Sequence, residues 1–242
     1  MKQTYLNWST GKDAALAYFF LKNNPDYHVS KLVTTINKDV GRVSMHGLHE
    51  TLLDAQAESI GLPLQKIYLP KDTSMEVYNA TMKETTRKLK SQAFTHAAFG
   101  DILLEDLKKY REEQLEAVGL KTVFPLWHHN TTSLMKQFLS LGFKAITVCV
   151  NAKLLDKSFV GRKVDEAFLN DLPHTVDPCG ENGEFHTFVY DGPIFSQPVP
   201  FKIGEKVMKG YTPSKNDDEK CFSDDVKSWD TQFWYCDLLA NQ

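Results

Sequence analysis

The sequence lacks any long hydrophobic run. Its longest uninterrupted apolar stretch, Ala14 to Leu21, is too short to cross a lipid bilayer. The chain also does not open with a charged region, an apolar segment and a small-residue cleavage site, so we expect no secretory signal peptide. These two absences predict a protein without membrane association that works in the cytoplasm.

Cysteine and net positive charge are also scarce. The four cysteines contain no C-x-x-C pair, a pattern typical of reduced thiols in a cytosolic protein. The formal net charge of −3 argues against a broad electrostatic surface for nucleic acid. With 242 residues and 42% hydrophobic content, the chain is long enough for one large or two modest domains.

The N-terminal half does contain a repeated alternation of strand and helix patterns. The predicted strands are Tyr5–Trp8, Leu32–Ile36, Ile67–Leu69, His96–Phe99 and Thr122–Phe124. The predicted helices between them are Asp13–Asn23, Leu48–Ile60, Met75–Gln92 and Leu103–Val118. Repeated β-α units predict an α/β fold with a mostly parallel sheet and helices on both faces. Ligands of such sheets bind beyond the carboxyl ends of the strands, where Ser9–Lys12, Asn37 and Gly100–Asp101 are expected.

The pattern changes after Trp127. A helix is predicted at Thr132–Leu141 and a strand at Ala145–Val150, followed by glycine- and proline-rich segments. We interpret residues 1–129 as a nucleotide-binding domain and 130–242 as a smaller α+β domain over the nucleotide crevice. In the second domain, Ser214–Asp230 is predicted to be an exposed loop and Phe233–Cys236 a strand.

The most informative stretch lies between the first strand and the first helix. The run Ser9-Thr10-Gly11-Lys12-Asp13-Ala14 forms a glycine-bearing turn at a helix start, which favours an anion such as phosphate. It is not the P-loop of nucleoside triphosphatases, because Asp13 follows Lys12 in place of Ser or Thr. It resembles the S-G-G-x-D-S pyrophosphate loop of ATP pyrophosphatases, with Thr10 and Ala14 as departures. The alternative is an ordinary connection in which Ser9 and Asp13 cap the helix.

Three further blocks extend this resemblance along the chain. They are Met45–Leu64 with its His46-Gly47 pair, Phe99-Gly-Asp-Ile102 followed by Phe124-Pro-Leu-Trp127, and Val176–Phe188. In order and spacing they resemble the diphthine–ammonia ligase family in a bacterial or archaeal form. Named members of that family adenylate a carboxylate of diphthine, a modified histidine on elongation factor 2, and ammonia then attacks it. The resemblance implies ATP, Mg²⁺ and ammonia as ligands and an unknown carboxylate, such as one on a modified histidine of a protein, as acceptor.

The resemblance also implies an ATP site. Ser9, Thr10, Gly11 and Lys12 would hold the pyrophosphate, with Lys12 also acting in catalysis and Asp13 holding magnesium. The adenine would lie toward Ile36, Asn37 and His46, and the ribose near Gly100 and Asp101.

A second constellation is Glu181 and Glu184. Two glycines near Glu181, Gly180 and Gly183, let the backbone bend so that carboxylates approach one point. With Asp177 upstream, these carboxylates are candidates for capping a magnesium ion, for binding an amine or ammonium, or for acting as a base beside the α-phosphate. The alternative is that Glu184 is structural and satisfies a backbone group or an arginine such as Arg162.

Other functions remain open at this point. An ATP pyrophosphatase that modifies RNA, such as a thiolase, would use paired cysteines that the sequence lacks. A nucleotide-binding regulator without turnover is compatible with Thr10 and Ala14. A stress-type adenine-nucleotide binding module would leave the Glu181–Thr187 block unexplained. A homo-oligomer is compatible with the sequence.

Overall fold

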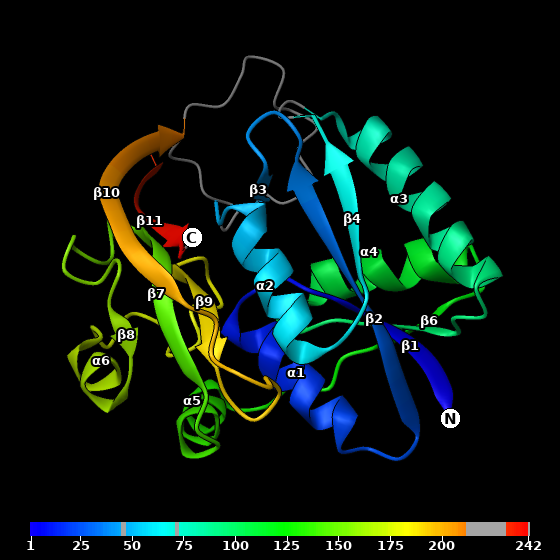
Figure 1. Cartoon of the computed structure of the whole chain (residues 1–242), viewed down its shortest axis with the longest axis horizontal. Helices are drawn as coiled ribbons and strands as arrows, with labels where there is room; N and C mark the ends of the chain where they lie inside the picture. The colour runs from blue at the N-terminus through cyan, green and yellow to red at the C-terminus, as the bar shows by residue number, and fades with distance from the viewer. Residues whose placement is uncertain (45–46, 71–72, 212–230, 242) are drawn as a thin grey trace.

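The structure is a computed structural model that describes residues 1–44, 47–70, 73–211 and 231–241 (Figure 1). His46 and the predicted loop Ser214–Asp230 therefore lie outside the described residues. In the described part of the chain, no helix is both long and apolar enough to span a membrane.

The N-terminal half forms a mostly parallel sheet. Its strands are β1 (Lys2–Asn7), β2 (Tyr27–Asn37), β4 (Leu64–Leu69), β5 (His96–Ala98) and β6 (Lys121–Val123). β2 lies between β1 and β4, and β1 continues the sheet through β5 to β6, with every one of these pairs parallel. A short strand, β3 (Arg42–Val43), pairs antiparallel with the end of β2. The predicted parallel sheet is confirmed.

Helices cover both faces of this sheet, as predicted. They are α1 (Lys12–Lys22), α2 (Glu50–Ile60), α3 (Met75–Ser91) and α4 (Glu105–Glu116). Neighbouring side chains of β1 point to opposite faces, so Leu6 belongs to the hydrophobic cluster with α1 and α2. Tyr5 belongs to a second cluster that includes Leu89 of α3 and Leu115 of α4.

The C-terminal half forms an antiparallel sheet with its own helices. Its elements are α5 (Thr131–Ser140), β7 (Lys144–Asn151), β8 (Lys163–Val164), α6 (Glu166–Asp171), β9 (Phe185–Asp191), β10 (Phe201–Tyr211) and β11 (Thr231–Ala240). β7 pairs with β9 along one edge and with β8 and β11 along the other. The predicted α+β character is confirmed. β8 and α6 were not predicted, because elements this short carry no periodic signal.

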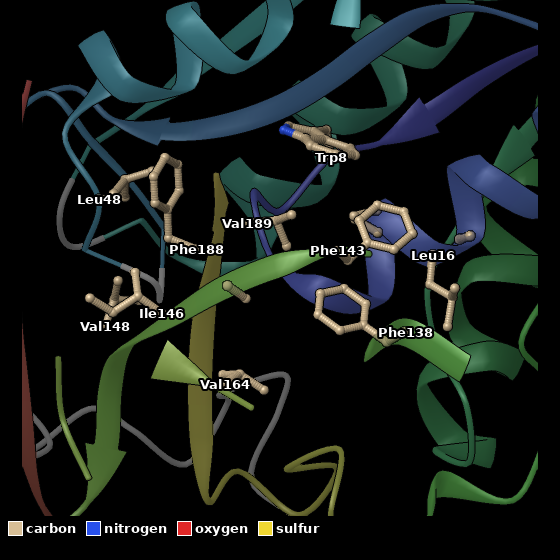
Figure 2. Close-up of a cluster of buried hydrophobic side chains, with 14 of the residues drawn as sticks. Trp8, Leu16, Leu48, Phe138, Phe143, Ile146, Val148, Val164, Phe188 and Val189 are labelled. Atoms are coloured by element: carbon tan, nitrogen blue, oxygen red, sulfur yellow. The ribbon is translucent and has the colours of Figure 1, made fainter. Parts of the chain in front are cut away.

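One hydrophobic core joins the two sheets. Figure 1 shows α1 and α2 between them, and Figure 2 shows Trp8 and Leu16 of the first half close to Phe138 and Phe143 of the second. Apolar side chains of the two halves pack against one another, so the contact between the halves buries both sets from water. The division between residues 129 and 130 stays a prediction.

Candidate functional site

The phosphate loop, Ser9–Asp13, lies where the strand order of the parallel sheet reverses. From β1 the chain goes on to β2 and β4 on one side, and then crosses to β5 and β6 on the other. The carboxyl ends of β1 and β5 are therefore neighbours, which is the position where α/β sheets bind ligands. The phosphate loop follows one of these ends, and Gly100–Asp101 follows the other.

Thr10 has a backbone conformation that favours glycine. Its φ is 73°, in the left-handed region, at the position where the pyrophosphate loop has its first glycine. The side chain is fully buried, and its Oγ1 has no hydrogen-bond partner in the described part of the chain. A buried hydroxyl without a hydrogen-bond partner is costly in free energy, so Thr10 carries this cost in addition to that of its backbone conformation.

The start of α1 carries no side-chain cap. Gly11 is the N-cap residue, so the interpretation in which Ser9 and Asp13 cap the helix is wrong. The Lys12 N–H donates to Thr187 Oγ1 of β9 at 3.1 Å. Among the described residues, no hydrogen bond is donated by the N–H groups of Gly11, Asp13 or Ala14. Those groups and the helix dipole make an anion-binding position.

Lys12 is the buried cation of the phosphate loop. Its Nζ donates to both carboxylate oxygens of Asp13, at 2.9 and 2.8 Å, and lies 5.5 Å from the centre of the Phe185 ring. Burial by itself lowers the pKa of Lys12, but the nearby Asp13, Cys179 and Glu181 outweigh it, and the pKa is raised. The ammonium therefore stays charged although it is only 4% exposed.

Gly100 fits closely against the start of α1. A Cβ at this position would lie 2.8 Å from the Asp13 carbonyl carbon and 2.9 Å from the Ala14 nitrogen, so a side chain is excluded. The next residue, Asp101, forms an ion pair with Arg111 of α4. Burial raises the pKa of Asp101, and the Arg111 charge opposes that shift. The structure thus brings Gly100 and Asp101 to the phosphate loop.

The acidic loop, Asp177–Glu184, approaches Lys12 from the C-terminal half. Asp177 organises it: Oδ1 accepts the N–H of Cys179 at 2.7 Å, and Oδ2 accepts the Thr131 hydroxyl at 2.7 Å. Gly180 adopts a φ of 71°, and a Cβ there would lie 2.9 Å from the Phe185 carbonyl oxygen. The acidic loop is therefore a tightly hydrogen-bonded turn that leads into β9.

Glu184 is part of that turn. Its carboxylate accepts the N–H groups of Asp177 at 3.0 Å and Asn182 at 2.8 Å, and also the Asn182 side-chain amide at 3.1 Å. The side chain is 1% exposed. These backbone contacts match the structural alternative, although Arg162 instead pairs with Asp171. A catalytic role for Glu184 stays a prediction without a contact in its favour.

Glu181 differs from Glu184 in the hydrogen bonding of its carboxylate and has a strongly raised pKa. No hydrogen bond to its carboxylate occurs among the described residues, and the side chain is half-buried. Burial raises the pKa of Glu181 to about 8, with a further contribution from Asp13 that Lys12 partly opposes. A carboxyl with this pKa can take or give a proton near neutral pH, so Glu181 is the candidate acid–base group.

Strand β9 ties the acidic loop to the phosphate loop. The Val189 N–H donates to the Thr10 carbonyl at 3.0 Å. The fully buried Gln56 of α2 donates its side-chain amide to the carbonyls of Thr10 and Val189, and it accepts the Trp8 indole N–H at 2.9 Å. The C-terminal half therefore fixes the conformation of the phosphate loop.

Sequence reasoning placed Asp177 beside the two glutamates, but it did not single out Thr187 or Gln56 as parts of the site. Both missed residues fall within blocks that carry the family resemblance, so the signal was present. Their roles depend on contacts between residues up to 175 positions apart, which no local pattern reveals.

The predicted adenine residues lie farther along the sheet. Asn7 at the end of β1 is level with Val33, so β2 runs on for four residues to Asn37. Ile36 is fully buried in the core, between β3 and β4, so no part of it is exposed to a ligand. Asn37 Oδ1 accepts the Asp39 N–H. These positions stay predictions.

The residues present fit a phosphate group better than a preformed metal site. In the described part of the chain, no group of three or more His, Cys, Asp or Glu side chains is arranged to hold a metal ion. Magnesium, however, is commonly bound by one or two carboxylates together with substrate phosphates. Asp13, at the mouth of the phosphate loop, is suitable for that role.

The sequence is similar to known proteins over most of its length. Residues 1–122 match the diphthamide synthase N-terminal domain, and residues 130–215 match the diphthamide synthase C-terminal domain. The chain is 25% identical to the diphthine–ammonia ligase of Homo sapiens over 172 residues, which cover 64% of each chain. It is 26% identical to the Danio rerio enzyme over 175 residues, covering 64% of this chain and 67% of that one.

Among solved structures, the fold is similar to the U34-tRNA thiolase NcsA from Methanococcus maripaludis. The TM-score is 0.37 at 14% identity, and the match covers 58% of this chain and 57% of that one.

Proposed function

The chain belongs to the diphthamide synthase family, and on that premise we propose that it is an ATP-dependent ligase that forms an amide. A carboxylate of the acceptor attacks the α-phosphate of ATP, pyrophosphate leaves, and ammonia then displaces AMP from the acyl-adenylate. The chain spans 64% of the human relative's length, so the acceptor and the whole activity are part of this proposal. The acceptor we propose is the carboxylate of diphthine on a protein, and we propose the cytoplasm as the place of action.

The observation that supports the proposal most strongly is the phosphate loop. It combines a helix start, where the N–H groups of Gly11, Asp13 and Ala14 donate no hydrogen bond among the described residues, with the charged ammonium of Lys12. Such donors stabilise the negative charge that accumulates on the leaving pyrophosphate. The Ser9 hydroxyl, half-buried at the same turn, adds a further donor.

The roles of the carboxyl groups follow from their partners. Asp13 would hold magnesium, which supplies positive charge to the phosphate oxygens. Glu181, which has a raised pKa, would accept a proton from ammonium or from the attacking amine. Glu184 would act as a positioning residue, because its carboxylate holds the turn that presents Glu181.

The nature of the products tests the proposal. With ATP, magnesium, ammonium and a diphthine-bearing elongation factor 2, we expect AMP and pyrophosphate in equal amounts by chromatography. We expect Lys12→Ala to reduce AMP release by about 10²- to 10³-fold, the usual loss for one donor to developing charge. Lys22→Ala, at the exposed end of the same helix, is the matched control and should keep full activity. ADP and phosphate as the products would contradict the proposal.

A further inference from the structure

A cavity lies at the end of the parallel sheet opposite to the phosphate loop. Its volume is about 650 Å³, it is open to solvent, and it lies at the amino ends of β1, β5 and β6. It is lined by Met1, Lys2, Pro25, Asp26, Lys90, Thr95, His96, Gly119 and Lys121. The phosphate loop follows the carboxyl end of β1, so the length of that strand separates the two places. A volume of this size is in the range of small-molecule sites.

Positive charge converges on this cavity from three separate elements. Lys2 comes from β1, Lys90 from α3 and Lys121 from β6, whereas Asp26 is the single carboxylate in the lining. Asp26 pairs with Lys2 at 3.6 Å, so the charges of Lys90 and Lys121 remain in excess. The chain as a whole carries a net charge of −3, which makes a local excess of cations stand out.

Two of the three cationic side chains make contacts that position their ammonium groups. Lys90 Nζ donates to the Gly119 carbonyl at 2.6 Å, which fixes its ammonium at the rim. Lys2 Nζ lies 4.4 Å above the centre of the Tyr27 ring, a cation–π position. The start of β6 is fixed by the Lys121 N–H, which donates to the Thr95 carbonyl. Because Lys2 and Lys90 are positioned in advance, a ligand loses less side-chain entropy on binding.

The pKa of His96 shows the effect of the lysine charges. Burial lowers the pKa of His96, and Lys2, Lys121 and Lys90 lower it further. Its Nδ1 is hydrogen-bonded with the Thr95 hydroxyl at 2.8 Å. Positive charges gathered in one cavity repel one another, and an anion bound between them relieves that repulsion.

We propose that this cavity binds a small, multiply charged oxyanion of the phosphate or diphosphate class. The site is independent of the proposed ligase reaction, because none of its residues belongs to the phosphate loop or the acidic loop. Ammonium groups and one imidazole suit phosphate oxygens, and the open rim admits a group attached to the phosphate.

Ring-resolved NMR of His96 in the full-length protein tests this, with inorganic pyrophosphate as the probe. We expect pyrophosphate to shift the His96 ring signals and to raise the pKa of His96, because the anion offsets the lysine charges. Lys90→Glu and Lys121→Glu should each weaken the binding about tenfold, the scale of losing one charge-assisted hydrogen bond. Lys88→Glu is the matched control, since Lys88 lies on α3, pairs with Glu84 and does not line the cavity.

A second arm separates this site from the phosphate loop. Lys12→Ala should leave the His96 response unchanged, although pyrophosphate binding at the loop is lost. No His96 shift, or an unchanged shift in the Lys90→Glu, Lys121→Glu double variant, would overturn the proposal. Tighter binding of a short RNA than of pyrophosphate at His96 would also overturn it, because the ligand would then be a polymer.

Discussion

The phosphate loop and the acidic loop meet at Lys12, but they use their polar groups in opposite ways. The phosphate loop has N–H groups without described partners, a buried hydroxyl without one and a threonine in a left-handed conformation. In the acidic loop, Asp177 and Glu184 accept hydrogen bonds from the turn's own backbone. Glu181 is the exception, since its carboxylate has no described hydrogen bond and its pKa is raised.

The difference separates binding groups from supporting groups. Polar groups normally find partners within the protein, so N–H groups at a helix start without a described partner indicate a place for an anion. A carboxylate already surrounded by backbone donors supports the turn instead. This reasoning assigns Glu181 to chemistry and Glu184 to structure, although the sequence presents them as an equivalent pair.

The comparison predicts its largest effect for Glu184→Gln. The variant replaces one acceptor oxygen with an amide that cannot accept the N–H groups it faces, so we expect about 2–3 kcal/mol lower stability. Urea denaturation measures this loss of stability. We expect ATP affinity to change little, because Glu184 contacts the turn and not the phosphate loop. If stability is unchanged while AMP release is lost, Glu184 is the base and the division between the two glutamates is wrong.

The next effect concerns Glu181 and depends on pH. The pKa of Glu181 rises from 4.5 to about 8 on folding, so between these pH values the folded protein holds a proton that the unfolded chain has released. Stability therefore falls as pH rises through this window, and Glu181→Gln removes the fall. We expect the variant to gain on the order of 1–3 kcal/mol over wild type by pH 8.

Thermal unfolding between pH 4.5 and 8 measures that gain. Glu116→Gln, exposed at the end of α4, is the control and should follow the wild-type curve. A constant difference between Glu181→Gln and wild type across the window would show that the carboxyl is not buried as a neutral acid.

A smaller effect is expected at the junction of the two loops. Thr187→Val removes the hydroxyl that accepts the Lys12 N–H, and we expect about 1 kcal/mol lower stability with a severalfold higher KM for ATP. Thr187→Ser keeps the hydroxyl and should restore both values. If Thr187→Ser and Thr187→Val have the same stability and the same KM for ATP, then β9 is positioned by packing and not by this hydrogen bond.

The smallest effect is predicted at Thr10. Glycine tolerates a φ of 73° and alanine does not, so Thr10→Gly should be about 1 kcal/mol more stable than Thr10→Ala. Both variants lose the buried hydroxyl, so their difference isolates the backbone strain. Calorimetric titration with ATP should show whether the hydroxyl contributes, since both would then bind more weakly than wild type.

The sequence was sufficient for the elements that repeat locally. Strand and helix periods predicted the parallel sheet and its helices, because these patterns depend on neighbours a few residues apart. The glycine-bearing turn before α1 was recognised from an equally local pattern, and its role in binding phosphate stays a prediction. The sequence showed only that Thr10 replaces a glycine of the family pattern, and the structure showed that the backbone there is left-handed.

The tertiary structure decided which polar groups are partnered. Glu181 and Glu184 lie three positions apart, and no local rule says which one the turn will surround. Thr187 and Gln56 reach the phosphate loop across 175 and 46 positions, through strand β9 and helix α2. Local sequence fixes backbone conformation and exposure pattern, whereas the partner of a buried polar group depends on how distant segments pack.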